Sequence, residues 1–189
     1  SLTSICALAQ KPVVRIGVVL DGPSSFSETA ASTFEQEITI VLSDEYEVLF
    51  PADKRLIGDW TKDRTGALID RLLGDDEVDM VLALGFLASQ QVCLKASLSK
   101  PVFAPYVGQA DLQQVPQEIR RLEPPPPEKP VQYRVSGVDN LAYLEMGGNL
   151  EAEISAFLEV VPFSSLTFLI VRDWAEMIPN VDAIGRSIE

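Results

Sequence analysis

The chain has 189 residues, of which 47% are hydrophobic and 23% are charged, a composition typical of a folded globular protein. Its 28 acidic residues outnumber its 15 basic residues, and the net charge of -13 argues against nucleic acid and against an anionic membrane surface as partners. The chain has no histidine and only two cysteines, Cys6 and Cys93, so it lacks the usual general base, the commonest metal ligand and the thiols of a zinc cluster.

Residues 1–10 differ from the rest because they are small and apolar, and charge begins only at Lys11. Ala7 and Ala9 have the small-x-small spacing of a signal-peptidase site. We therefore interpret residues 1–10 as the remnant of an export signal, with an ordinary N-terminal tail as the alternative. Export predicts a periplasmic protein. No other run approaches the 18 or so apolar residues that cross a bilayer, so we expect no membrane-spanning segment.

The next 60 or so residues alternate between predicted strands and helices. A run rich in β-branched residues predicts a strand over 13–20, and a second short strand is predicted over 46–50. Ser27 is expected to cap the helix between them, whose buried stripe has helical spacing: Phe34, Ile38, Val41 and Leu42. A second helix is expected to begin at Asp59 or Thr61 and to stop at Gly74.

A third strand, over 78–84, is almost entirely apolar, as in a strand buried on both faces. Gly85 breaks this run, a helix is predicted over 86–96, and a fourth strand follows over 100–105. The order of strands and helices predicts an α/β fold with an open, mainly parallel sheet and helices on both faces. We expect residues 11–145 to form one such lobe.

The alternating pattern lapses over 107–134, a stretch that contains the proline-rich run 123–130. Four successive prolines favour polyproline II, which predicts a stiff exposed spacer; a docking motif for an aromatic groove is the alternative. Residues 146–189 are expected to hold a crossover and the beginning of a second lobe that continues beyond the chain. The predicted elements of this last part are a helix over 149–160, a strand over 165–171 and a helix from 178.

Turn residues follow several of the predicted strands, and the carboxyl ends of parallel strands meet at one edge of a sheet, where ligands bind. Glycines there let the backbone approach a ligand, the first amides of the helices can receive an anion, and aromatic rings can supply a wall. The candidate ligand-binding residues are Asp21, Gly22, Ser24, Gly85, Phe86, Leu87, Ala88, Tyr106, Asp173 and Trp174. Ordinary turns with aromatic residues packed beside them are the alternative.

The sequence contains no recognisable catalytic motif. A glycine-rich dinucleotide loop, a Walker loop and a nucleophile elbow are all missing, so we expect no enzyme, catalytic residue, cofactor or metal. Asp21 invites comparison with the phosphoacceptor of receiver domains, but the acidic pair of that site is lacking. The acidic residues Asp75, Asp76, Glu77 and Asp79 are interpreted as a charged surface turn.

The order of elements, with Val14-Arg-Ile-Gly-Val-Val-Leu20, Val78-Asp-Met-Val-Leu-Ala-Leu-Gly85 and Lys100-Pro-Val-Phe-Ala104, resembles that of type I periplasmic binding proteins. The nearest branch is the substrate-binding proteins of ABC transport systems often assigned to aromatic amino acids. That branch typically has Thr-Pro-Ala after the third strand, where it holds the carboxylate of the ligand, and Asp-Pro after the fourth. This chain has Phe86-Leu-Ala88 and Tyr106-Val-Gly108 instead, which favours a more apolar or aromatic ligand.

The resemblance implies an exported solute-binding protein of an ABC-type uptake system, which closes two lobes over a small amino-acid-like or aromatic ligand. The implied partners are that ligand and a membrane permease or other envelope protein. The alternative is an interaction or sensor module of a cell-envelope assembly that keeps the fold without a role in transport.

Overall fold

The computed structural model describes residues 11–121, 132–147, 150–167, 169 and 172–176. Residues 1–10, including Cys6, and the proline-rich run 123–130 therefore lie outside the described part. So does the helix expected from residue 178.

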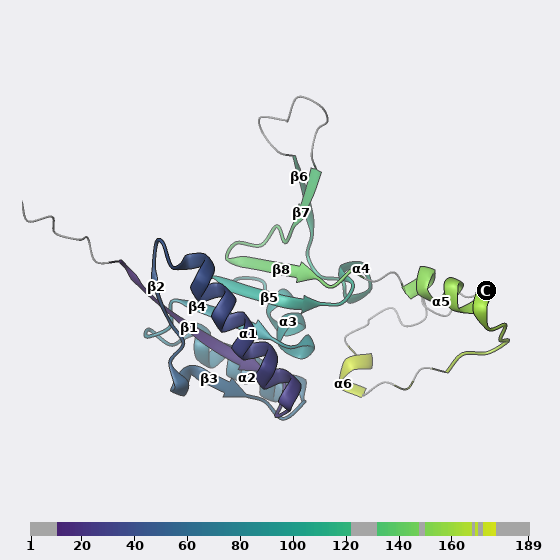
Figure 1. The fold of residues 1–189 in the computed structure, drawn as a ribbon, viewed down its shortest axis with the longest axis horizontal. Coiled ribbons are helices and arrows are strands. Elements are labelled where there is room, and N and C mark those ends of the chain that lie inside the picture. The colour runs from purple at the N-terminus through teal and green to yellow at the C-terminus, as the bar shows by residue number, and fades with distance from the viewer. Residues whose placement is uncertain (1–10, 122–131, 148–149, 168, 170–171, 177–189) are drawn as a thin grey trace, which may run out of the picture.

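A six-stranded parallel sheet forms the centre of the molecule, in the order β2-β1-β4-β5-β8, with β3 also paired to β1 (Figure 1). The strands are β1 (Val13–Leu20), β2 (Glu47–Leu49), β3 (Arg55–Ile57), β4 (Met80–Leu84), β5 (Val102–Val107) and β8 (Leu141–Glu145). The predicted α/β fold is confirmed. Strand β3 was not predicted, because three residues are too few to show a period.

Helices cover both faces of this sheet (Figure 1). Helix α1 (Ser25–Leu42) lies on one face, over a cluster that includes Ile16, Leu20 and Leu82. Helices α2 (Lys62–Leu73) and α3 (Phe86–Cys93) lie on the other face, over a larger cluster of buried residues. Successive residues of β1 and β4 alternate between the two clusters, so both central strands are buried on both faces.

Two observed helix termini agree with the predicted ones, and a third differs. The hydroxyl of Thr61 accepts the amide N–H of Arg64 at the start of α2, and Gly74 ends that helix, as predicted. Helix α1 begins earlier than predicted, because Ser24 is the capping residue and accepts the amide N–H of Ser27. The predicted buried stripe of α1 is also wrong at Val41, which is 74% exposed, whereas the adjacent Leu42 is partly buried.

The strand order places a topological switch between β1 and β4. The chain leaves β1 through α1 toward β2 on one side, and it leaves β4 through α3 toward β5 on the other side. Because the two connections pass over opposite faces of the sheet, the loops that follow β1 and β4 diverge. A crevice beside such a switch is the usual ligand site of an open parallel sheet.

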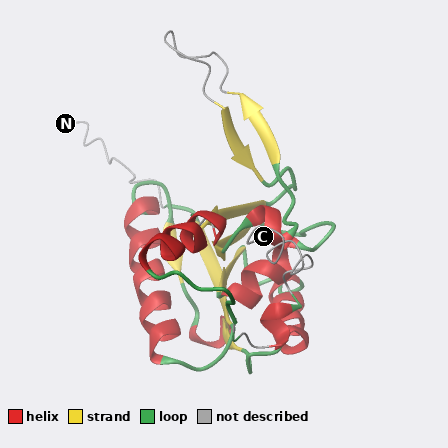
Figure 2. Ribbon diagram, turned by 90° about the vertical axis from the view of Figure 1, so that its right-hand side faces the viewer, coloured by secondary structure: helices red, strands yellow, loops and turns green. Residues whose placement is uncertain are grey.

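The stretch 107–134 contains regular structure that the sequence pattern did not predict. Helix α4 (Ala110–Gln113) follows β5, and β6 (Glu118–Arg121) pairs antiparallel with β7 (Gln132–Val135). This β6–β7 ribbon projects away from the sheet and helices (Figure 2). Each of its strands has only four residues and no apolar face, so hydrophobic alternation could not reveal it.

Beyond β8 the described residues form α5 (Leu150–Val160) and α6 (Arg172–Ala175). The strand predicted over 165–171 is wrong for the residues described there, 165–167 and 169, which are not in a strand; Leu169 is 98% exposed. Its apolar run has no neighbouring strand to pair with among the described residues, and an unpaired strand is not stable in water. No helix in the described part is both long and apolar enough to cross a membrane.

Candidate functional site

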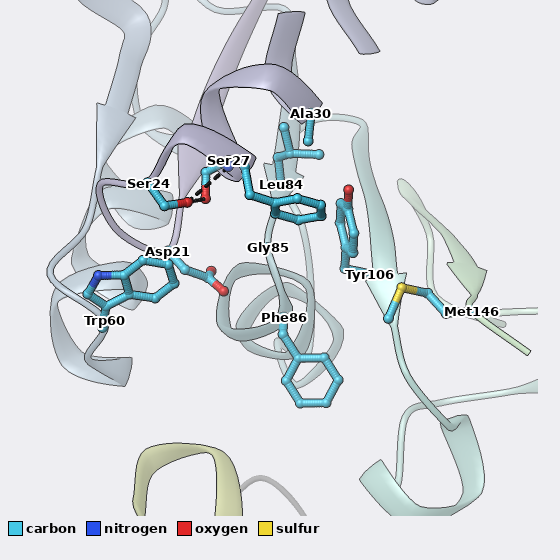
Figure 3. Close-up of a pocket in the computed structure, with 11 residues that line it drawn as sticks. Asp21, Ser24, Ser27, Ala30, Trp60, Leu84, Gly85, Phe86, Tyr106 and Met146 are labelled. Carbon is cyan, nitrogen blue, oxygen red and sulfur yellow. Dashed lines mark hydrogen bonds between the residues drawn. The ribbon is translucent and has the colours of Figure 1, made fainter. Parts of the chain in front are cut away.

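The ends of β1, β4 and β5 meet at a cavity of about 470 Å³, beside the topological switch (Figure 3). This volume lies within the usual range for small-molecule sites. Asp21 follows β1, Gly85 follows β4 and Tyr106 lies near the end of β5. The predicted convergence of these three positions on one rim is therefore found. The predicted residues that line the cavity are Asp21, Ser24, Gly85, Phe86 and Tyr106.

The side chain of Asp21 is bound to the start of α3. Its Oδ2 accepts the amide N–H of Leu87 at 2.9 Å and its Oδ1 accepts that of Ala88 at 2.8 Å, and the residue is only 3% exposed. The first amides of a helix have no partner within the helix and carry partial positive charge, so a carboxylate satisfies them well. Asp21, which directly follows β1, thus caps α3 although it lies 66 residues before Leu87 in the chain.

Burial and hydrogen bonding shift the pKa of the Asp21 carboxyl group in opposite directions. Burial raises the pKa of its carboxyl group above the ordinary value of 3.8, because the charged form loses solvation. The amides of Leu87, Ala88 and Phe86 oppose this rise, since they stabilise the charged form. Burial is the larger effect, so the pKa is raised.

Gly85 is required where β4 passes into α3. Its φ is +155°, and a Cβ atom on this residue would lie 2.3 Å from the carboxyl carbon of Asp21. A side chain would therefore displace the carboxylate from the amides of α3. The absence of a Cβ at this position allows the Asp21 cap to form.

Trp60 is a part of the site that the sequence analysis missed. It follows the unpredicted strand β3, and its amide N–H donates to the carbonyl oxygen of Asp21 at 2.8 Å. Its φ is +69°, an unusual and strained conformation for a bulky residue. The indole covers Gly22, where a Cβ would lie 2.3 Å from Trp60 Cε2. This backbone arrangement holds the ring beside Asp21 at the edge of the cavity (Figure 3).

At the start of α1, as at the start of α3, a side chain of the protein accepts a hydrogen bond from a helix amide. Ser24 Oγ accepts the amide N–H of Ser27 and lies 2.8 Å from Ser27 Oγ. From the sequence we expected the first amides of these helices to receive an anion or a carboxylate from a ligand. At Ser27, Leu87 and Ala88 the acceptor is a side chain of the protein itself, so that expectation is wrong for these three amides.

The opposite wall of the cavity is held in place by contacts between β5 and its neighbours. The ring of Tyr106 packs edge-on against Phe34 of α1, with 6.2 Å between the ring centroids. Its amide N–H donates to Ser89 Oγ, and Ser89 Oγ donates in turn to the carbonyl oxygen of Ala83. Ser89 is buried and thereby joins α3 to both β4 and β5.

Three predicted residues do not line the cavity, and for two others the structure describes no side chain that could be placed relative to it. Gly22 lies beneath Trp60, and the side chains of Leu87 and Ala88 are fully buried, so these three support the site without facing it. Asp173 and Trp174 belong to α6, and their side chains lie outside the described part. The cavity-lining residues that were not predicted are Phe26, Ser27, Ala30, Trp60, Leu84 and Met146.

The acidic turn after α2 is an ion-pair network. Lys54 Nζ lies 2.8 Å from Asp75 Oδ2 and 2.9 Å from Glu77 Oε2, while Asp79 Oδ2 accepts the amide N–H of Arg15. These carboxylates hold the turn to β1 and to the short helix η1 (Ala52–Lys54). The described residues contain no group of three or more side chains that could hold a metal ion.

Comparison of the chain with protein-family models, with curated proteins and with solved structures found no match. The description of the site therefore depends on its geometry. It is a small, mostly apolar cavity with one buried carboxylate at the switch point of a doubly wound α/β sheet.

Proposed function

We propose that the chain is the ligand-binding lobe of an exported solute-binding protein that serves an ABC-type uptake system in the periplasm. A small ligand binds at the carboxyl ends of the parallel strands, and a second lobe closes over it. The proposal assigns the site to recognition and release, with no catalytic residue. A membrane permease or another envelope protein is the expected partner.

The observation that carries this proposal is the shared cavity at the ends of β1, β4 and β5. It lies at the place in the described sheet where the connections after β1 and β4 diverge, and three strand ends contribute residues to it. Apolar and aromatic side chains dominate its lining, as is usual for small-molecule sites. The resemblance of the strand sequences to type I periplasmic binding proteins agrees with this position.

A thermal-shift experiment with amino acids, aromatic metabolites and amines tests the proposal. A ligand present at 100 times its Kd stabilises the folded chain by about 2.7 kcal/mol, which corresponds to roughly 5 to 10 °C in Tm for a chain of this size. We expect at least one aromatic compound to raise Tm. Flat melting curves across the whole panel would argue against a solute-binding role.

Two variants show whether a Tm shift arises at this cavity. Trp60→Gly removes the indole and also relieves the positive φ, so the variant should fold but lose most of the ligand-induced shift. Val41→Ala removes an exposed apolar side chain that does not line the cavity, and it should keep the full shift. Equal shifts in both variants would place the ligand elsewhere.

The projecting β6–β7 ribbon favours a second candidate function, an interaction module of a cell-envelope assembly. Among the described residues, β6 and β7 pair with each other and with no other strand, and Ile119 is 64% exposed. Deleting residues 123–130 and measuring co-purification with the permease or other envelope proteins separates the two functions. Loss of co-purification with unchanged ligand shifts would support a separate interaction role for this arm.

A further inference from the structure

The only charged side chain among the described residues of the cavity lining is negative. Among the described residues that line the cavity, Asp21 is the only one with a charged side chain. The amides that an anion would use at α3 are occupied by this same carboxylate. Among the described lining residues a ligand carboxylate would therefore meet no lysine or arginine, and it would have to displace Asp21 from Leu87 and Ala88.

The start of α3 does not cancel the charge of Asp21. The dipole of a helix is equivalent to about half an elementary positive charge at its N-terminus, against a full negative charge on an ionised carboxylate. Its two oxygens have about four acceptor positions; the hydrogen bonds from Leu87 and Ala88 use two of them, and the amide of Phe86 also stabilises the charged carboxylate. The cavity floor thus remains negative and can accept a further hydrogen bond.

Aromatic rings surround this carboxylate. Trp60 follows β3, Phe86 begins α3 and Tyr106 belongs to β5, and Figure 3 shows all three around Asp21 and Gly85. Phe26 of α1 adds a fourth ring to the lining. The face of an aromatic ring carries negative potential and attracts cations, most strongly for tryptophan. Rings and carboxylate therefore favour the same charge on a ligand.

From this charge pattern we infer that the cavity selects a small organic cation, an amine or quaternary ammonium on an apolar or aromatic body, and discriminates against carboxylates. This inference rests on the proposed ligand-binding function and specifies the class of ligand. The ammonium group lies toward Asp21 and the rings, and the apolar body fills the remainder of the cavity.

A series of ligands that share one ring system and differ in charge tests the inference. Tryptamine is a cation, tryptophol is neutral, indole-3-acetate is an anion and tryptophan carries both charges. Isothermal titration and ligand-observed NMR at about pH 8 would measure each Kd with the unaltered chain. We expect tryptamine to bind at least about tenfold more tightly than indole-3-acetate, with tryptophol between them.

The possible binding results distinguish the preference for cations from the solute-binding role on which it rests. Binding of indole-3-acetate or tryptophan as tight as that of tryptamine would overturn the cation preference and leave a solute-binding role standing. Absence of binding by all four compounds up to millimolar concentration would count against both.

The variant Asp21→Asn keeps the size of the side chain and removes its charge. In this variant the ratio of the Kd values for indole-3-acetate and tryptamine should fall toward one. Asp44→Asn removes an exposed carboxylate outside the cavity and should keep the ratio, which controls for the overall charge of the protein. An unchanged ratio in a folded Asp21→Asn variant would overturn the role of Asp21. If that variant does not fold, the ligand series with the unaltered chain decides the question.

Discussion

Asp21 illustrates how one residue serves the fold and shapes the site. It is 3% exposed, and its two oxygens accept two amides of α3. The carboxylate that a ligand would otherwise supply at this helix belongs to the protein.

The raised pKa of Asp21 predicts a pH-dependent contribution to stability. The folded state binds this proton more tightly than the unfolded state, so the contribution of Asp21 to the free energy of unfolding falls as pH rises through 3.8 and stays low above the folded pKa. Asp21→Asn cannot titrate. The difference in unfolding free energy, variant minus wild type, should therefore rise in urea titrations as the pH increases above 3.8. A difference that falls with pH would mean that the amides outweigh burial.

Gly85 should tolerate substitution far less than Gly66 of helix α2. Gly85→Ala places a Cβ in a backbone conformation with φ of +155° and 2.3 Å from the Asp21 carboxyl group, so we expect it to cost about 3 kcal/mol or more of unfolding free energy. Gly66→Ala, inside α2, meets only the end of the Gln91 side chain at 3.3 Å and should stabilise by up to about 1 kcal/mol. Urea unfolding of both variants measures the contrast. Equal effects would contradict the requirement for glycine at residue 85.

At the scale of elements, buried polar side chains join α3 to its neighbours. Ser89 joins it to β4 and β5, and Gln90 joins it to α4, where Gln90 Nε2 donates to the carbonyl oxygen of Gln113 and Gln113 Nε2 donates to Gln90 Oε1. Such bonds are specific in direction and distance. They set the position of α3, and with it the positions of Phe86 and the amides that hold Asp21.

Ser89→Ala should weaken the attachment of α3 to β4 and β5 and lower the unfolding free energy. The amide N–H of Tyr106 and the carbonyl oxygen of Ala83 each lose a buried partner, so we expect a cost of about 1 to 3 kcal/mol. Ser32→Ala, on the exposed side of α1, removes a hydroxyl that donates to the Glu28 carbonyl and should change stability by less than about 0.5 kcal/mol. Chemical denaturation of the pair tests this expectation. A cost at Ser89 no larger than that at Ser32 would argue against the connection.

At the scale of the whole molecule, the sheet with its two helical layers is distinct from the β6–β7 ribbon (Figures 1 and 2). Both hydrophobic clusters are built from the sheet, its helices and adjoining loops, and no ribbon residue whose side chain is described belongs to either cluster. Replacing residues 118–135 with a short glycine-serine linker should therefore change the unfolding free energy by less than about 1 kcal/mol, since a two-stranded ribbon adds little stability of its own. A broad or non-cooperative transition in that variant would show that the ribbon supports the core.

Cys93 offers a probe of opening of the whole core. It is fully buried in the cluster beneath α2 and α3, and burial raises the pKa of its thiol to about 12. In a Cys6→Ser variant, the remaining thiol should be unreactive toward Ellman's reagent at about pH 8 until the protein unfolds, because only the exposed thiolate reacts. The labelling rate in urea should follow the unfolding equilibrium. Fast labelling without urea would indicate local opening of this layer.

Local patterns in the sequence were sufficient for the elements with strong periodicity. The apolar runs of β1 and β4, the start of α2 at Thr61 and its end at Gly74 all match their predictions, because hydrophobic alternation and capping depend on residues close together in the chain. The open parallel sheet, and the meeting of Asp21, Gly85 and Tyr106 at one edge, followed from the order of these elements.

The tertiary contacts of these residues could not be predicted from local sequence patterns. Asp21 was predicted to face a ligand, yet its partners are amides 66 and 67 residues further along the chain. Trp60 lines the cavity because it follows β3, a strand of three residues that is too short to show a hydrophobic period in the sequence. Hydrogen bonds and ring contacts of this kind depend on which distant segments the sheet brings together, so only the folded arrangement reveals that the amides of α3 are already occupied and that the cavity floor is negative.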